Sequence, residues 1–354
     1  MSQRLFNFSA GPATMPLPVL QASASALVDY QASGVGIAEV SHRGKEFIAV
    51  LAEAKERCRA LMGIPDDYEI LFLQGGATQQ FELVPMNLLK TKAAYSVTGS
   101  WAKKAAAAAK RYGEVVVAGD SSASNFAELP PLEVPADAEY LHICSNNTIY
   151  GTRYSEFPEH DCLVADMSSE IASRVIDVSR FGLIYAGAQK NLGPAGLTLV
   201  IIRRDLLDAD RDIPAIFNYA KHAEADSCLN TPPTFGIYVL LETFRWIEEQ
   251  GGVAALEERN ARKAGLLYSA IDGSDGFYTG AVTDIANRSE MNVTFTLPDD
   301  ELSARFISEA AAQGMVALKG HRSVGGIRAS VYNAMPEAGC ARLAEFMETF
   351  RKQA

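Results

Sequence analysis

Residues 162–200 read CLVADMSSEIASRVIDVSRFGLIYAGAQKNLGPAGLTLV, and this stretch decides the fold. Three short apolar runs begin in it, Cys162–Ala165, Gly182–Ala186 and Gly196–Ile202, and each stops at polar or glycine residues. Runs of this length are typical of buried strands in a sheet that helices cover on both faces. The stretch therefore predicts an α/β fold.

An acid and an amine follow two of these runs. Asp166 closes the first run, and Gln189 and Lys190 follow the Gly187-Ala188 turn after the second. Open α/β sheets bind ligands at the ends of their strands, so these side chains are candidates for a cofactor site. A partly desolvated lysine can condense with an aldehyde, and pyridoxal phosphate also needs an anion beside its ring nitrogen. Spacing alone leaves open that Asp166 caps a turn and that Lys190 is a solvated lysine.

A glycine-rich turn joins the expected strand Glu69–Leu73 to a helical pattern that resumes at Phe81. In QGGATQQ, residues 74–80, the glycines let the backbone approach a ligand, and the Thr78 hydroxyl and first-turn N–H groups are donors for a phosphate. The turn is neither GxGxxG nor a Walker loop, so a nucleotide is not indicated. A packing role for the glycines is the alternative.

Three more side chains lie in turns that could hold a ligand. Trp101 follows the strand Ala93–Thr98 and could stack on a planar ring. Thr148 lies in SNNTIYGT after the strand Tyr140–Cys144, and Ser9 lies in NFSAGPA, an ordered turn marked by glycine and proline. For each of them a purely structural role, in the core or in a polar turn, is the alternative.

Two of the five histidines precede an arginine. His42-Arg43 stands at the entrance of an amphipathic helix, and His321-Arg322 lies in a glycine-rich segment that also carries Arg328. Guanidinium groups bind carboxylates and phosphates through two hydrogen bonds at once. This surplus of cations suits a substrate with both a carboxylate and a phosphate, or with two carboxylates, although each pair alone could serve solubility.

Composition limits the classes of partner and compartment. The 354 residues carry a net charge of −11 without a Lys/Arg cluster, so we expect neither nucleic acid nor an anionic membrane as a partner. No secretory signal or run of eighteen apolar residues occurs. The five cysteines are odd in number and form no CxxC pair, which indicates free thiols and a cytoplasmic protein, and we expect no metal site.

The remaining pattern predicts further elements. Residues 205–212 are charged and are expected to be helical, whereas residues 216–235 are aromatic and poorly periodic and are expected to form a functional loop. Amphipathic helices are expected over 235–250 and 253–271. A strand over 292–297 and helices over 303–313 and 337–352 then indicate a smaller α/β domain, since the chain is longer than one typical domain.

The motif IYAGAQKNLGPAG, residues 184–196, preceded by VADMSSEIASRVIDVSRFG, resembles the cofactor-lysine segment of the phosphoserine aminotransferases, a fold-type I family of pyridoxal phosphate enzymes. The similarity extends from NFSAGPA at Asn7 to YNAMP at Pro336. It implies a large cofactor-binding domain, residues 16–255, with a mainly parallel mixed sheet flanked by helices. It also implies a smaller C-terminal α/β domain, residues 256–354, with segment 1–15 packing near the active site.

The resemblance also implies roles for individual residues. Lys190 would form a Schiff base with pyridoxal 5'-phosphate, with Asp166 at the ring nitrogen, Trp101 on the ring and Thr148 beside its phenolic oxygen. The cofactor phosphate would be bound by residues of both subunits of a homodimer, Ala77, Thr78 and Gln189 with the other subunit's Asn230 and Thr231. The substrate would be bound at both of its ends, by Arg328 at the α-carboxylate, by His42, Arg43, His321 and Arg322 at the distal anion, and beside the turn that contains Ser9.

The implied reaction is a reversible ping-pong transfer of the amino group from L-glutamate to 3-phosphohydroxypyruvate. Its products are O-phospho-L-serine and 2-oxoglutarate, a step of L-serine biosynthesis. A related use of 4-phosphohydroxythreonine in pyridoxine biosynthesis is left open. The sequence departs from the family pattern at Val40 and Cys228, where methionine is common, and in GGAT where GGAS is more usual; these departures affect fine substrate preference.

Two other classes of protein share part of this pattern. An alanine-glyoxylate type aminotransferase or a cysteine desulfurase would retain Lys190 and Asp166, but would not need two His-Arg pairs. A desulfurase would also need a mobile reactive cysteine, for which Cys228 and Cys340 are poor candidates. A non-enzymatic regulator on the same fold would be expected to carry a DNA-binding segment or a basic patch, and neither is found in the sequence.

Overall fold

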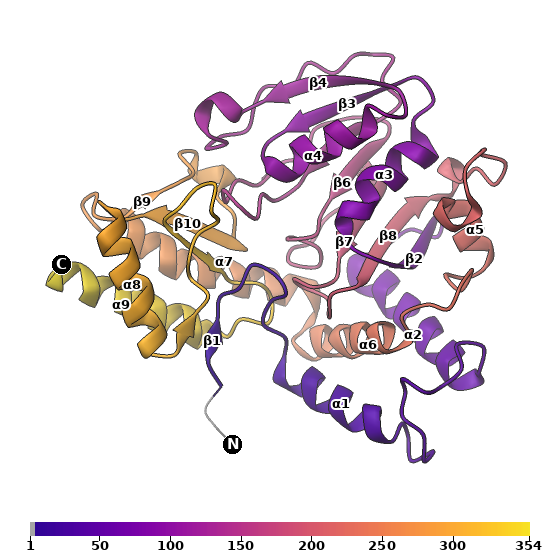
Figure 1. Ribbon diagram of the computed structural model, residues 1–354, viewed down its shortest axis with the longest axis horizontal. Coiled ribbons are helices and arrows are strands. Elements are labelled where there is room, and N and C mark those ends of the chain that lie inside the picture. Colours follow the sequence, from indigo (N-terminus) through magenta and orange to yellow (C-terminus); the bar gives the residue numbers. More distant parts are fainter. Residues whose placement is uncertain (1–3) are drawn as a thin grey trace.

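The computed structural model describes residues 4–354 and is built around one seven-stranded sheet (Figure 1). Its strand order is β2-β8-β7-β6-β5-β3-β4. All neighbours from β7 to β4 are parallel, whereas β8 is antiparallel to both β7 and β2. The strands are β2 (Tyr68–Gln74), β3 (Lys92–Val97), β4 (Glu114–Asp120), β5 (Leu141–Cys144), β6 (Leu163–Asp166), β7 (Phe181–Gly187) and β8 (Leu197–Arg203). The predicted α/β fold with a mixed, mainly parallel sheet is confirmed.

Helices cover both faces of this sheet because its strands are apolar on both sides. Along β2, Ile70 and Phe72 belong to one buried cluster and Leu71 and Leu73 to another, as the alternation of side chains in a strand requires. The first cluster is covered by α1 (Leu17–Val28), α2 (Lys45–Met62) and α6 (Thr234–Glu249). The second is covered by α3 (Ala77–Leu88), α4 (Ser100–Ala109) and α5 (Tyr219–Glu224).

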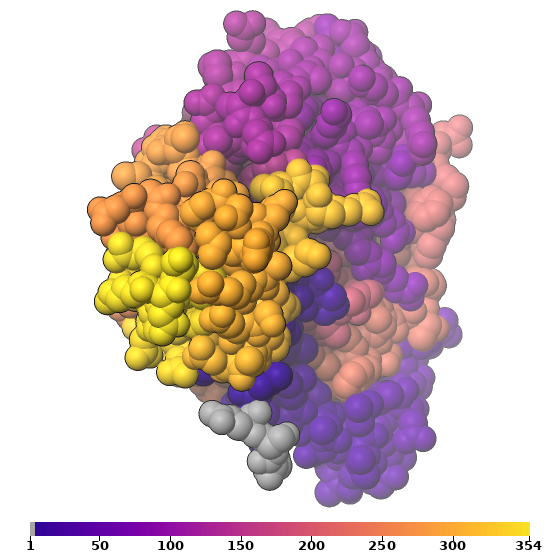
Figure 2. Space-filling model, turned by 60° about the vertical axis from the view of Figure 1, so that its left-hand side comes forward, coloured from indigo at the N-terminus to yellow at the C-terminus, as the bar shows by residue number. Residues whose placement is uncertain are grey.

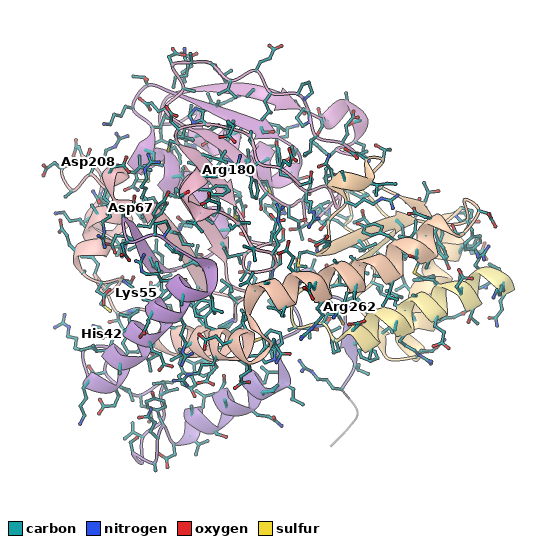
Figure 3. All side chains as sticks on the ribbon, turned by 180° about the vertical axis from the view of Figure 1, so that it is seen from behind. His42, Lys55, Asp67, Arg180, Asp208 and Arg262 are labelled. Atoms are coloured by element: carbon teal, nitrogen blue, oxygen red, sulfur yellow. The ribbon has the colours of Figure 1, made fainter. Side chains whose placement is uncertain are left out.

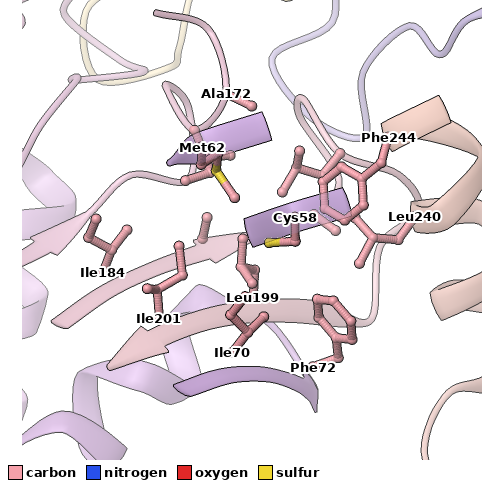
Figure 4. Close-up of a cluster of buried hydrophobic side chains, with 14 of the residues drawn as sticks. Cys58, Met62, Ile70, Phe72, Ala172, Ile184, Leu199, Ile201, Leu240 and Phe244 are labelled. Atoms are coloured by element: carbon pink, nitrogen blue, oxygen red, sulfur yellow. The ribbon is translucent and has the colours of Figure 1, made fainter. Parts of the chain in front are cut away.

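The first cluster shows how tightly the helices fix the sheet. Cys58 of α2 and Leu240 and Phe244 of α6 pack onto Phe72 and Leu199 of the sheet (Figure 4). All of these side chains are buried. Burial of a large aliphatic or aromatic side chain contributes about 1.5–3 kcal/mol, so this layer makes the strand ends a rigid platform for a site.

The C-terminal part forms a second, smaller layer beside the sheet (Figure 1). Its antiparallel sheet has the order β12-β10-β9, and the N-terminal strand β1 pairs in parallel with β11. The elements are β1 (Phe6–Asn7), α7 (Gly252–Asp272), β9 (Thr279–Gly280), β10 (Asn292–Thr296), α8 (Asp300–Ala312), β11 (Met315–Val316), β12 (Ile327–Ser330) and α9 (Glu337–Gln353). Short 3-10 helices occur at Ser122–Ser124, Val178–Arg180, Arg204–Leu206, Ala215–Phe217 and Ile285–Asn287.

The helix α7 connects the two parts of the structure. Its first turns place Val253 and Leu256 in the core beneath the large sheet, while Ala264 and Leu267 lie in the C-terminal core. The predicted boundary between residues 255 and 256 falls inside this helix, and the division into two domains stays a prediction. None of the helices within residues 4–354 is long and apolar enough to cross a membrane.

Two expectations for the connecting segments were wrong. Residues 205–212 are not a helix beyond the short turn Arg204–Leu206, because local bonds such as that from the Asp210 N–H to the Asp208 carboxylate (3.1 Å) compete with helical ones. Residues 216–235 are not a plain loop, because they include α5. The side chain of Asn218 caps α5 by accepting from the N–H groups of Ala220 and Lys221.

Candidate active site

A cavity of about 340 Å³ lies at the strand ends between the large sheet and the C-terminal part. This volume is in the range of small-molecule sites. Most of the residues predicted for the site line it, namely Ala77, Thr78, Trp101, Thr148, Asp166, Gln189, Lys190, His321 and Arg328. The structure therefore brings together side chains from six separate sequence segments.

Lys190 lies in the turn after β7, and its Nζ donates a hydrogen bond of 2.6 Å to Thr148 Oγ1. Burial lowers the pKa of Lys190, while the negative charge of Asp166 acts in the opposite direction. A lysine with a lowered pKa offers a larger fraction of neutral, nucleophilic amine near neutral pH. The local geometry suits attack on an aldehyde.

Asp166 is the last residue of β6 and is only 6% exposed. Its carboxylate accepts hydrogen bonds from the Ser168 N–H (2.9 Å) and hydroxyl (2.6 Å). Burial raises the pKa of Asp166, and the bonds from Ser168 and the nearby Lys190 partly offset this effect. The turn-capping role considered as an alternative is therefore real, and it holds the carboxylate in place at the cavity wall.

The helix α3 begins at the cavity, where its N-terminus can bind an anion, as the glycine-rich turn led us to expect. Its N-cap, Gly76, provides no side-chain cap, and Gly76, Ala77 and Thr78 all line the cavity. Gly75 has a φ of +94°, a conformation that glycine adopts readily and that turns the chain from β2 into the helix. First-turn N–H groups and the helix dipole favour a phosphate at this point.

An indole, an imidazole and a guanidinium complete the wall. Trp101 lies in the first turn of α4, and His321 and Arg328 come from the C-terminal part. Figure 2 shows gold atoms of the C-terminal part reaching across to the purple surface of the large part. Burial lowers the pKa of His321, and the nearby cations Arg328 and Arg322 lower it further.

The other predicted residues do not line the cavity within one chain. Ser9 is adjacent to it, because the next two residues, Ala10 and Gly11, line it. His42 lies at the periphery of the molecule before α2, and Arg43 beside it is exposed (Figure 3). The remaining three are exposed on connecting segments, Asn230, Thr231 and Arg322.

Several wall residues were not predicted. Asn146, Ser168 and Ser169 are buried polar residues that line the cavity, and Cys144 lies beside them. The turn that Asp166 could cap contains Ser168 and Ser169, but neither serine was predicted as part of a cavity wall. Asn146 lies in the same polar segment as Thr148, and this segment after β5 was the available signal.

These residues fit pyridoxal phosphate. The wall combines an amine that can bind an aldehyde, a buried carboxylate that can face a ring nitrogen, an indole and an uncapped helix N-terminus for a phosphate. In addition, Gln189 Oε1 and Asn146 Oδ1 are buried without a hydrogen-bond partner among residues 4–354, as expected for atoms near a ligand site.

Comparisons with known proteins agree with this chemistry. The model of the aminotransferase class-V family matches residues 5–343. A phosphoserine aminotransferase of Geobacillus kaustophilus is 52% identical over 99% of both chains. The solved phosphoserine aminotransferase of Bacillus circulans subsp. alkalophilus is 48% identical and superposes with a TM-score of 0.97 over 99% of both chains.

A structure described as phosphoserine aminotransferase with bound PLP, from Trichomonas vaginalis, is 38% identical, with a TM-score of 0.93 over 98% of this chain and 100% of that one. The predicted enzyme class and cofactor are thereby confirmed: the chain is a pyridoxal phosphate-dependent aminotransferase. With identities near 50% over full lengths, this chain belongs to the class-V aminotransferases and, within them, to the phosphoserine aminotransferase family.

Proposed function

We propose that this enzyme transfers the amino group of L-glutamate to 3-phosphohydroxypyruvate, giving 2-oxoglutarate and O-phospho-L-serine, in a reversible ping-pong reaction of L-serine biosynthesis. The observation that carries the proposal is the position of Lys190 and Asp166 in one cavity with His321 and Arg328. A reactive amine, an acid, a guanidinium and an imidazole that can donate a hydrogen bond match an anionic amino acid as substrate. The similarity to relatives named phosphoserine aminotransferase supports the choice of substrate.

When bound, pyridoxal 5'-phosphate supplies an electron sink for the α-carbon of the substrate. We assign its aldehyde to Lys190, its ring nitrogen to Asp166 and one ring face to Trp101. The three residues proposed for its phosphate in the same subunit are Ala77, Thr78 and Gln189. Thr148 Oγ1, already 2.6 Å from Lys190 Nζ, is placed to tune the basicity of the lysine.

Lys190 also moves the proton. With substrate and cofactor bound, its neutral Nζ would take the proton from the substrate α-carbon and return it two atoms away, at the carbon derived from the cofactor aldehyde. The lowered pKa of Lys190 favours this neutral form. Asp166 stays fixed by Ser168 during these steps, because both of its hydrogen bonds come from the rigid turn after β6.

The substrate has two anionic ends, and we propose separate cations for them. Arg328 is half-buried and lines the cavity, which suits the α-carboxylate common to glutamate and phosphoserine. His321 and Arg322 lie at the outer side and are assigned to the distal carboxylate or phosphate. Ser9 lies in the turn beside this substrate site.

The predicted site residues that lie outside the cavity would bind cofactor or substrate if the enzyme is a homodimer. We propose that Asn230 and Thr231 bind the cofactor phosphate of the neighbouring subunit and that His42 and Arg43 extend its distal-anion pocket. An exposed apolar surface supports a second copy as partner: on the helices α1 and α2, Leu17 is 48% exposed, Leu27 43% and Ile48 54%.

Two further assignments are part of the proposal. The division into domains 16–255 and 256–354 is supported by the separate C-terminal core. The five cysteines form no disulfide, which supports a cytoplasmic location. A second phosphorylated substrate pair, 4-phosphohydroxythreonine and its keto acid in pyridoxine biosynthesis, carries the same α-carboxylate and phosphate and would use the same cations.

The test is a comparison of amino acceptors with L-glutamate as the donor. We expect kcat/KM for 3-phosphohydroxypyruvate to exceed that for pyruvate, glyoxylate or oxaloacetate by at least about a hundredfold, the factor that ~3 kcal/mol from a charge-assisted phosphate contact provides. Equal use of pyruvate or glyoxylate would contradict the proposal. Lys190→Ala is the control, because its residual rate measures any contaminating transaminase.

A further inference from the structure

A buried chain of hydrogen bonds connects the cavity wall to the N-terminal turn. Asn146 Nδ2 donates to Ser169 Oγ (2.8 Å) and to Asn292 Oδ1 (2.9 Å). Asn292 Nδ2 in turn donates to the Tyr332 hydroxyl (3.1 Å), which donates to the carbonyl oxygen of Ala10 (2.8 Å). The chain thus joins five residues that are far apart in the sequence.

The Ala10 carbonyl at the end of this chain determines which group donates in each of its hydrogen bonds. The Ala10 carbonyl can only accept, so the Tyr332 hydroxyl must donate to it. The hydroxyl oxygen then accepts from Asn292 Nδ2, which leaves Asn292 Oδ1 to accept from Asn146. Asn292 is completely buried and also donates to Ser330 Oγ (2.9 Å), so its carboxamide has no spare donor.

The turn at the end of the chain packs on the catalytic lysine. A Cβ added to Gly11 would lie 3.4 Å from Lys190 Cγ and 3.7 Å from Lys190 Cε, so the lysine stem lies close beside Gly11 and a side chain at this position would press on it. Gly11 has a φ of +140°, which other residues rarely adopt. The turn therefore limits the space in which the Lys190 side chain moves.

The two ends of this turn are fixed by backbone bonds to different parts of the structure. The Phe8 N–H donates to the Val316 carbonyl (3.0 Å), and the Ala13 N–H donates to the Gln189 carbonyl (2.9 Å). Between these anchors, the Tyr332 hydroxyl is the side-chain donor to the turn's backbone, at Ala10. Removal of that hydroxyl would leave residues 9–12 held at their ends and by two local bonds, from the Ser9 N–H to Asn7 Oδ1 (3.1 Å) and from the Gly11 N–H to Ser9 Oγ (3.5 Å).

We propose that Asn292 and Tyr332 are positioning residues that hold the turn 9–12 against Lys190 and so keep the lysine aligned for both half-reactions. Neither residue lines the cavity, and the hydrogen bonds of both lead to the Ala10 carbonyl. The Tyr332 hydroxyl also interacts with Thr148 and Arg328 of the site, so the exchange of the turn, rather than activity alone, measures the anchoring. The role of Lys190 in this inference rests on the proposed function, whereas the anchoring of the turn does not.

The test compares two tyrosines with the same kind of bond. Tyr332→Phe removes the hydroxyl that holds Ala10, and Tyr278→Phe removes a buried hydroxyl that donates to the Met347 carbonyl (2.8 Å) in the C-terminal core. Tyr278→Phe loses one buried hydrogen bond, whereas Tyr332→Phe loses two, because its hydroxyl also accepts from Asn292, so Tyr332→Phe should lose more thermal stability. Only Tyr332→Phe should loosen the turn.

Hydrogen–deuterium exchange of the full-length holoenzyme measures the turn directly. In Tyr332→Phe we expect the amides of Ser9, Ala10, Gly11 and Ala13 to exchange about tenfold faster, the population change that ~1.4 kcal/mol produces, and we expect no change there in Tyr278→Phe. Unchanged exchange in Tyr332→Phe, or equal acceleration in both variants, would overturn the proposal.

Kinetics provide the second measurement. Because the turn contacts the lysine in both half-reactions, kcat/KM for the donor and for the acceptor should fall by the same factor, about tenfold, in Tyr332→Phe. Asn292→Leu should give the same phenotype, and the double variant should be no worse than either single one. If the losses of kcat/KM in the two single variants add up in the double variant, the two residues do not act through one chain of hydrogen bonds. An inactive wild type with the expected exchange pattern would refute the proposed function and leave the anchoring intact.

Discussion

Lys190 Nζ lies 2.6 Å from Thr148 Oγ1 and donates a hydrogen bond to it, although the two residues belong to different strand-end segments. This bond stabilises the protonated amine and therefore opposes the effect of burial on the pKa of Lys190. The reactivity of the lysine is thus set by a hydroxyl as well as by the buried Asp166, and the following predictions address these groups.

Thr148→Val removes the hydroxyl while retaining the shape of the side chain. We expect the pKa of Lys190 to fall further, since its ammonium form loses an acceptor. The measurement is the pH dependence of cofactor reassociation with apoenzyme, followed by visible absorbance, and its midpoint should move to lower pH. Thr148→Ser, which keeps the hydroxyl, is the control. A midpoint that moves to higher pH would contradict this account.

Lys190→Ala should abolish turnover and the visible absorbance of the covalently bound cofactor. The reason is that the amine is both the attachment point and the proton carrier in the proposed reaction. Lys263→Met serves as a comparison, because Lys263 is a buried lysine that does not line the cavity. An active Lys190→Ala variant with normal absorbance would refute the assignment.

Asp166→Asn should lower kcat by about 10²–10³, the range seen when one preorganised electrostatic contact is removed. The amide keeps the volume and can still bond to Ser168, but it cannot balance a positive charge on the ring nitrogen. The same change removes the negative charge that raises the pKa of Lys190, so that pKa should fall. Stopped-flow absorbance of each half-reaction measures the rate, and an unchanged rate would exclude Asp166 from this role.

Complementation between subunits tests the proposed homodimer. Lys190→Ala and Thr231→Ala subunits, each impaired alone, should regain activity when they are co-expressed, because a mixed dimer has one site with an intact Lys190 and the partner's intact Thr231. About half of the dimers are mixed when subunits combine at random, and they would carry one working site each. Tandem affinity purification of differently tagged subunits isolates this species. If it is as impaired as its parents, Thr231 does not act across the interface.

The buried Lys263 should make stability depend on pH. Its Nζ donates to the carbonyls of Val331 (2.8 Å) and Tyr332 (2.7 Å), and burial lowers its pKa to about 7. The unfolded chain has the ordinary lysine pKa of roughly 10.4, so it binds more protons between these values. The free energy of unfolding should therefore rise with pH from about 7 to 10, by at most ~1.4 kcal/mol per pH unit, relative to Lys263→Met. Urea titrations at several pH values measure this, and equal slopes for both proteins would contradict it.

The sequence was most informative where strands end in polar residues. Asp166 and Lys190 follow apolar runs directly, and the sheet places them in one cavity because the carboxyl ends of parallel strands lie at one edge. The glycine turn before Ala77 was also predictable, since glycine and the absence of a capping side chain are local signals.

Other features depended on contacts that no local pattern reveals. Asn292 and Tyr332 belong to the C-terminal part, and their relation to Ala10 exists only once the N-terminal turn has been folded over the cavity. The segment 205–212 was mispredicted because its charged periodicity resembles a helix, while short-range bonds such as that to Asp208 favour turns. The roles of His42, Asn230 and Thr231 stay predictions, because they require a second subunit.

The pairing of β1 with β11 determines when, during synthesis of the chain, the N-terminal strand can take its final position. Phe6 pairs with Met315 and Asn7 with Val316, so β1 must wait for a strand that is synthesised much later. The turn that covers Lys190 follows directly on β1 and can be set only after that late pairing. A nascent chain truncated before residue 315 would thus retain the large sheet, but the turn would not yet cover Lys190.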